Sequence, residues 1–317
     1  MSEEPVPHAP HIPVLGTEIA AALASSDEGW LLDGTLGAGG HARLLLETCP
    51  RARLLGLDRD PQALTLARER LGPLAERATL VHAPFAEAAQ VAAAHGVSQL
   101  LGALLDLGVS SMQLDRAERG FSFRSDGPLD MRMDPGAPLD ARTLVATLPE
   151  GELADVIYQL GEEPASRRIA RAIVEARARA PITTTGQLAD IVRQALEGAR
   201  GRPRARGPHG RRARLDPATR TFQALRLKVN DELGQLERAL PDLFGLLRPG
   251  GRLAVISFHS LEDRPVKTFF RQLKQERRAR VLTKKPLRAG DEEMRENPRA
   301  RSAKLRLCEK LQPSPGD

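Results

Sequence analysis

The stretch that decides the fold is Trp30-Leu-Leu-Asp-Gly-Thr-Leu-Gly-Ala-Gly-Gly-His41, continued after a helix-length gap by Leu55-Gly-Leu-Asp-Arg-Asp60. Residues 30–32 predict a short buried strand that ends at Asp33. A glycine-rich turn, a helix over 41–47 and a second strand over 53–57 ending at Asp58 follow. This order of strand, glycine turn, helix, strand and acid predicts the start of a doubly wound α/β fold.

The glycine turn is a weak signal by itself, because Gly37-x-Gly39-x-x-Ala42 fits a loose nucleotide-binding pattern that also arises by chance. A tight turn without a ligand is the alternative. Asp58 adds weight, because an acid about 20 residues after such glycines can hold the hydroxyls of a ribose. Asp60 and Pro61 suit the start of a helix, which places Asp58 at the end of its strand. Two cofactors that contain adenosine stay open, a dinucleotide and S-adenosylmethionine.

Composition sets further bounds on the class of protein. The chain has 317 residues, of which 41% are hydrophobic, so a sizeable core is expected. No apolar run is long enough to span a membrane, and residues 1–11 have no signal-peptide core. Cys49 and Cys308 are the two cysteines, which makes disulfides and cysteine zinc sites improbable. These features predict a cytoplasmic protein.

Positive charge is concentrated in two segments. Residues 198–214 contain seven arginines and no acid, and residues 264–310 contain sixteen lysines and arginines against six acids. The whole chain has a net charge of +6, so the remainder is net negative. Such segregation predicts a polyanionic partner, most simply nucleic acid. A general preference for arginine would explain the abundance of basic residues but not their clustering.

The pattern continues with three further strands and a returning tail. We expect strands over 79–83, 100–105 and 252–258, and a final edge strand near 302–309. The fourth strand ends at Asp106, so Asp33, Asp58 and Asp106 should lie at one edge of a parallel sheet. Phe85 follows the third strand, where a core role and packing against an adenine are equally compatible with the sequence.

A helical insertion interrupts the sheet pattern. Residues 115–138 predict a long ordered loop anchored by Phe121, Phe123, Met131 and Met133, and helices are expected near 140–148, 151–161, 165–179 and 185–197. Apolar spacing then predicts one long helix over 217–240. The expected domains are 1–114 and 216–317, which together form the sheet domain, and 115–215, an inserted all-α subdomain for substrate recognition.

The motifs in their order resemble a known family. The chain is similar to the bacterial small-subunit rRNA cytosine-N(4) methyltransferases, the MraW family, over about residues 11–307. The motifs are His11-Ile-Pro-Val-Leu, Asp33-Gly-Thr-Leu-Gly-Ala-Gly-Gly-His41, Asp58-Arg-Asp-Pro, Asp106-Leu-Gly-Val-Ser-Ser, Gln113-Leu-Asp, Arg119-Gly-Phe-Ser-Phe, Asp130-Met-Arg-Met-Asp134, Thr221-Phe-Gln-Ala-Leu-Arg, Ser257-Phe-His-Ser-Leu-Glu-Asp-Arg and Asn297-Pro-Arg-Ala-Arg-Ser-Ala-Lys-Leu-Arg.

The resemblance implies a class I methyltransferase sheet that is doubly wound, mostly parallel and Rossmann-like. It implies S-adenosyl-L-methionine as the cofactor and, as partner, the small ribosomal subunit with its 16S rRNA, where a cytosine of the decoding region is methylated on its 4-amino group. A monomer and a homodimer are both left open. The positions that match the family's cofactor site are Gly39, Gly40, His41, Asp58, Phe85, Asp106 and Gln113.

The chemistry of amine methylation needs no covalent enzyme intermediate, because the amine attacks the methyl group directly. Asp106 could accept a hydrogen bond from the target amine as the catalytic group, or bind the methionine amino group, and the resemblance favours the second role. Phe121, Phe123 or His259 could stack on the base, or serve as core and turn scaffolding. His41 has no metal-ligand partners at a recognisable spacing, so no metal site is expected.

Two other functions use some of the same features. A nicotinamide-dependent dehydrogenase would share the opening strand–helix–strand unit, but it has no evident role for the Asp106 segment or for the basic tail. A non-catalytic rRNA-binding or assembly factor would need only the basic segments.

Overall fold

The computed structural model describes residues 12–197 and 216–312. The chain divides into two compact units, one formed by Met1–Gly108 with Leu233–Asp317 and the other by Val109–Glu232. The arginine run 198–214 and the residue His11 lie outside the described residues. Each unit is built around a core of its own.

The first unit contains a seven-stranded sheet in the order β3-β2-β1-β4-β5-β7-β6. Neighbours in the run β3-β2-β1-β4-β5 pair in parallel, whereas β7 pairs antiparallel to both β5 and β6. This arrangement confirms the predicted doubly wound, mostly parallel sheet. The strands are β1 (Gly29–Asp33), β2 (Ala52–Asp58), β3 (Ala78–His82), β4 (Leu100–Asp106), β5 (Leu247–Ser257), β6 (Ala279–Val281) and β7 (Lys304–Lys310).

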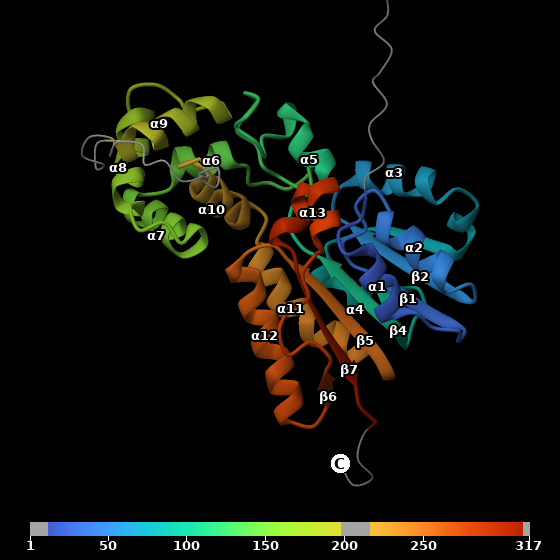
Figure 1. The fold of residues 1–317 in the computed structure, drawn as a ribbon. Helices are drawn as coiled ribbons and strands as arrows, with labels where there is room; N and C mark the ends of the chain where they lie inside the picture. The colour runs from blue at the N-terminus through green and yellow to red at the C-terminus, as the bar shows by residue number, and fades with distance from the viewer. Residues whose placement is uncertain (1–11, 198–215, 313–317) are drawn as a thin grey trace, which may run out of the picture. The chain divides into compact units, whose positions relative to one another are not determined.

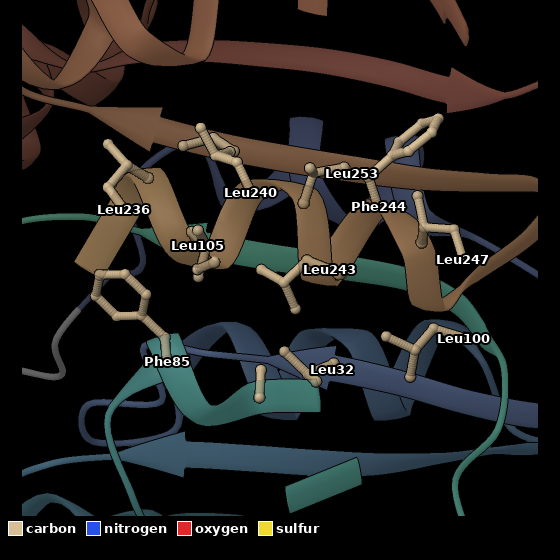
Figure 2. Packing of buried hydrophobic residues seen from close by; sticks show 14 of the residues in the cluster. Leu32, Phe85, Leu100, Leu105, Leu236, Leu240, Leu243, Phe244, Leu247 and Leu253 are labelled. Atoms are coloured by element: carbon tan, nitrogen blue, oxygen red, sulfur yellow. The ribbon is translucent and has the colours of Figure 1, made fainter. Parts of the chain in front are cut away.

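Helices cover both faces of this sheet (Figure 1). Neighbouring strand residues point to opposite faces, so Leu31 packs in one core cluster and Leu32 in the other. Figure 2 shows Leu32, Leu105 and Leu253 meeting the apolar side of α11. One face is covered by α1 (Gly16–Leu23), α2 (Gly40–Thr48) and α3 (Pro61–Leu71), and the other by α4 (Ala88–Ala94), α11 (Glu232–Leu246) and α12 (Ser260–Gln275).

The sheet differs from the prediction at its C-terminal side. The tail strand β7 is not an edge strand, because it lies between β5 and β6. The edge strand β6 has three residues, which is too short for an alternating pattern to reveal it. The strand β5 begins at Leu247, five residues before the predicted start at 252.

The second unit is helical. Its core gathers side chains from α6 (Ala141–Thr147), α7 (Glu150–Gly161), α8 (Ser166–Arg177), α9 (Thr185–Glu197) and α10 (Thr219–Val229). The unit begins at Val109 and ends at Glu232, whereas the sequence predicts an insertion over 115–215. The C-terminal boundary moves because α10 packs its apolar residues, such as Phe222 and Leu225, into the helical core.

The predicted long helix over 217–240 is wrong. The helices α10 and α11 are separate, with Asn230 and Asp231 between them, and Asp231 has a φ of 46°. The buried Asn230 side chain donates to the carbonyl oxygens of Met131 and Arg226 and accepts from the backbone N–H of Met133. These bonds to a distant loop fix the chain at the point where the helix would otherwise continue.

The loop that follows residue 115 is tied to the helical core, as its apolar residues predict. Phe121, Met131 and Met133 are buried in this core, and Phe123 packs edge-on against Phe222 with ring centroids 4.7 Å apart. The Arg119 side chain donates to two backbone carbonyls, those of Arg132 and Met133. Among the described residues, no helix has the length and apolar character needed to cross a membrane.

Candidate functional site

The carboxyl ends of the parallel strands bring the three predicted acids to one edge of the sheet. Asp33 ends β1, Asp58 ends β2 and Asp106 ends β4. Asp33 is in register with Gly56 of β2 and with Leu104 of β4, so Asp58 and Asp106 lie two residues further along their strands. Ligands of doubly wound folds bind at this edge.

The glycine turn between β1 and α2 requires glycine at two positions, because a larger residue there would not fit. Gly39 has a φ of 77° and is the N-cap of α2, and a Cβ at this position would lie 3.1 Å from Ala67. At Gly34 a Cβ would lie 2.7 Å from the Leu105 side chain. Gly40 begins α2, so the amide-rich start of that helix lies at the same edge of the sheet as the acids.

Asp58 stabilises this turn through hydrogen bonds and still has acceptor positions for a ligand. One carboxylate oxygen accepts from the Gly37 N–H at 2.7 Å and the other from the Asp60 N–H at 2.8 Å. A carboxylate has about four acceptor positions, so these two bonds leave room for two hydroxyl donors. Burial raises the pKa of Asp58, although the two backbone donors oppose this shift.

Asp33, His41 and Asp106 form a buried polar cluster. The Nε2 of His41 lies 3.5 Å from an oxygen of Asp106, and Asp33 is only 1% exposed. Burial raises the pKa of Asp33 to about 6, although the charge of His41 opposes it. Burial lowers the pKa of His41, but the facing carboxylates of Asp106 and Asp33 outweigh it, so the pKa lies above its usual value.

Thr35 ties this cluster to the turn. Its backbone N–H donates to Asp33 at 3.1 Å, and its hydroxyl oxygen accepts from the Asp106 N–H at 2.6 Å. One oxygen of Asp33, one oxygen of Asp106 and both ring nitrogens of His41 are buried and make no hydrogen bond in the described part of the chain. Buried polar atoms of this kind call for a polar or charged ligand.

Two of the predicted site residues, Phe85 and Gln113, have structural roles. Phe85 is 8% exposed and lies in the core beside Leu32 and Leu105, with the Arg59 guanidinium 5.9 Å from its ring centroid (Figure 2). Phe85 is therefore a core residue, and its contact with an adenine stays a prediction. Gln113 belongs to the second unit, where its side chain accepts from the Ser110 N–H in the capping box of α5 (Ser111–Asp115).

The motifs do not indicate Asp33 as a site residue, although its position at a strand end is a usable signal. His259 is one of the residues predicted as candidates for base stacking. His259 is the N-cap of α12, and its Nε2 lies 3.1 Å from the buried carboxylate of Glu262. Among the described residues, no three His, Cys, Asp or Glu side chains are grouped so that they could hold a metal ion.

The fold and the site together define a class of protein. A parallel sheet in this order, with an antiparallel strand between β5 and β6 and acids at its carboxyl edge, is the fold of class I methyltransferases. Residues 8–311 match the MraW methylase family. The chain belongs to the MraW methylase family and is an S-adenosylmethionine-dependent methyltransferase.

Relatives with about half of their residues identical extend over nearly the whole chain. The "Ribosomal RNA small subunit methyltransferase H" of Geobacter sulfurreducens is 52% identical over 95% of this chain and 99% of its own length. Proteins of the same name from Sorangium cellulosum and Heliobacterium modesticaldum are 51% and 48% identical, each over 95% of this chain and over 91% and 98% of their own lengths.

The residues at the sheet edge fit S-adenosylmethionine. Asp58 offers acceptors for the two ribose hydroxyls, and the free oxygens of Asp33 and Asp106 offer acceptors for the methionine ammonium group. The helix start at Gly40 suits the methionine carboxylate. These acceptors and the helix start therefore match a cofactor that carries a ribose and both charges of an amino acid.

Proposed function

We propose that this chain transfers a methyl group from S-adenosylmethionine to the 4-amino group of a cytosine in the decoding region of 16S rRNA, acting in the cytoplasm on the small ribosomal subunit. The observation that carries the proposal is the family match over residues 8–311 together with relatives named as small-subunit rRNA methyltransferases. The acid-lined sheet edge supports it, because its acceptors suit the methyl donor.

The cysteines favour methylation of nitrogen rather than of the base carbon, which requires a thiolate nucleophile. Cys49 is fully buried and contacts backbone groups of Leu23 and Ser25. Cys308 is buried in β7, and burial raises the pKa of its thiol to about 12. Both thiols are buried in the core and are not placed to attack a base, whereas an amine needs only positioning and acceptors for its protons.

Asp106 is the residue that we assign to the methionine ammonium group. Its free oxygen is buried, and its other oxygen faces His41 at 3.5 Å, so the carboxylate is held in one orientation. The bound cofactor supplies an electrophilic methyl group. The protein positions the cofactor and excludes water, and the target base must leave its stack to reach the methyl group.

The helical unit is the part of the chain that we assign to substrate recognition. It includes the loop 120–134, which is held by Arg119 and Asn230 and not by regular secondary structure. Long loops of this kind in compact proteins commonly carry function.

The decisive test is methylation of small ribosomal subunits that lack the modification, followed by mass mapping of the methylated nucleotide. We expect one cytosine of the decoding region to gain one methyl group on its amine. Binding of the particle without methyl transfer would instead indicate an assembly factor, and a product methylated at carbon 5 would contradict the assigned chemistry.

A further inference from the structure

The solvent face of α12 carries a row of basic side chains. Lys267, Arg271 and Lys274 are exposed, whereas Val266, Phe270 and Leu273, about 100° around the helix, anchor it in the sheet core. The three basic residues are spaced by four and three positions, so they lie on one stripe of the helix. The stripe is about 10 Å long at the helical rise of about 1.5 Å per residue.

The acids of α12 are held within the fold, and Asp263 also interacts electrostatically with Lys267, the first residue of the row. Glu262 is buried in the first turn, where its carboxylate accepts from the Phe258 N–H at 2.8 Å. Asp263 is held by Arg306 of β7 through bonds of 2.6 and 3.0 Å. The helix has no further acid before it ends at Gln275.

The structure separates the basic residues of 264–310 into two groups. Several are engaged inside the fold, because Arg306 pairs with Asp263, Arg280 with Glu309, and the Lys310 ammonium with two backbone carbonyls. Lys267, Arg271 and Lys274 form no hydrogen bond or ion pair with any residue that the structure describes. The engaged residues hold the fold together, and the row on α12 is available to a ligand.

We propose that the row Lys267–Arg271–Lys274 is a docking surface for the phosphate backbone of the substrate RNA; this inference rests on the proposed function. A nucleic-acid strand presents about three phosphates over a 10 Å length of helix axis, which matches the row in length and charge. The surface is rigid, because the buried face of α12 fixes the helix on the sheet. The sequence predicts a polyanionic partner from the basic segments 198–214 and 264–310, and the row on α12 narrows the second segment to three residues.

The test compares two triple variants that lose the same charge. The first is Lys267→Gln, Arg271→Gln and Lys274→Gln. The control is Arg51→Gln, Arg53→Gln and Arg68→Gln, three exposed arginines from the region of β2 and α3. Equilibrium binding to unmodified small subunits is measured across a salt series with S-adenosylhomocysteine present, so that binding is separate from turnover. Melting temperature and cofactor affinity verify that both variants are intact.

We expect the α12 variant to reduce the slope of log affinity against log salt by about two to three, since each phosphate contact adds about 0.7–0.9. The KM for the particle should rise several-fold, with kcat and cofactor affinity unchanged. The control should keep the wild-type slope.

Equal slopes for wild type and the α12 variant would overturn the inference while leaving the proposed function intact. An equal loss in the control would also overturn it, because the effect would then come from net charge. If the α12 variant lost affinity for anionic phospholipid vesicles but kept its affinity for particles, the surface would be assigned to a membrane. That result would contradict the proposal. Wild-type protein that binds particles without methylating them would refute the proposed function and leave the docking surface standing.

Discussion

The Nε2 of His41 in α2 lies 3.5 Å from the Asp106 carboxylate at the end of β4, and both groups are largely shielded from solvent. Asp33 completes the cluster, fully buried and with one oxygen that makes no hydrogen bond in the described residues. An arrangement of two carboxylates around one imidazole costs folding energy, because charge is removed from water. The two carboxylates make this edge of the sheet suitable for a ligand that carries a positive charge.

This cost predicts a pH dependence of stability. Burial raises the pKa of Asp33 from 3.8 to about 6, so the folded protein binds the proton more tightly than the unfolded chain does. The stability that protonated Asp33 contributes is therefore complete below about pH 4 and lost as the pH rises through about 6. Asp33→Asn removes this titration, and its stability relative to wild type should grow by up to about 3 kcal/mol over that window.

Denaturant unfolding of the two proteins without cofactor between pH 4 and pH 7.5 measures this difference. Calorimetry at pH 7.5 should show weaker S-adenosylmethionine binding by the variant, because an acceptor for the ammonium group has lost its charge. A stability difference that stays constant with pH would show that Asp33 titrates normally in the folded protein.

Asp58→Ala should weaken S-adenosylmethionine binding by about 1–3 kcal/mol through the loss of charge-assisted bonds to the ribose. The variant also loses the acceptor for the Gly37 and Asp60 N–H groups, so part of the loss reflects a looser turn. Asp58→Asn keeps one side-chain oxygen, so its affinity for S-adenosylmethionine should lie between those of wild type and Asp58→Ala. The exposed Glu69 of α3 provides the control through Glu69→Ala. Wild-type affinity in a folded Asp58→Ala protein would remove the residue from the cofactor site.

Gly34→Ala should destabilise the protein by about 1–3 kcal/mol, because the added carbon would lie 2.7 Å from the Leu105 side chain and 3.1 Å from that of Phe85. Gly245→Ala in α11 is the matched control, since nothing lies within 4 Å of a Cβ there. It should stabilise the helix by about 0.5–1 kcal/mol. Thermal and denaturant unfolding of both variants decide the comparison, and equal effects would show that close packing is not what requires glycine at 34.

The parallel part of the sheet was predictable because its strands include three short apolar runs that end in acids. The segment 100–105 is buried throughout, and Asp60 with Pro61 marked the start of α3 at the correct residue. Three strands of this kind in one parallel sheet place their terminal acids at one edge, so Asp33, Asp58 and Asp106 could be grouped from the sequence alone.

The remaining features depend on residues far apart in the chain. Asn230 ends α10 because its side chain bonds to Met131 and Met133, about a hundred residues earlier, and apolar periodicity carries no sign of that contact. The proximity of His41 and Asp106 likewise arises because the start of α2 and the end of β4 lie at the same edge of the sheet. The engagement of the Gln113 side chain is different, because the local spacing Ser110-x-x-Gln113 is a capping-box pattern that could have indicated it.

Asn230→Ala should destabilise the helical unit by about 2–4 kcal/mol, because the Met131 carbonyl and the Met133 N–H would be left buried without their partner. Faster hydrogen exchange at residues 130–134 should accompany the loss. The KM for the small subunit should rise while cofactor affinity stays unchanged, if this loop takes part in recognition. Wild-type exchange rates in the loop would show that Asn230 does not hold it.

Asp106→Asn separates the two roles that remain for this carboxylate. If Asp106 binds the methionine ammonium group, the loss of its charge should raise the dissociation constant of S-adenosylmethionine by about 10- to 100-fold, the range for a hydrogen bond to a charged group. The kcat at saturating cofactor should then change little, because Asn keeps the oxygen and the shape. If Asp106 accepts from the target amine, cofactor affinity should be preserved and kcat should fall. Our assignment predicts the first result, because the free oxygen of Asp106 is buried, while its other oxygen faces His41. Calorimetry with the cofactor and single-turnover methylation of small subunits measure the two quantities separately, and a loss confined to kcat would move Asp106 from the cofactor to the target cytosine.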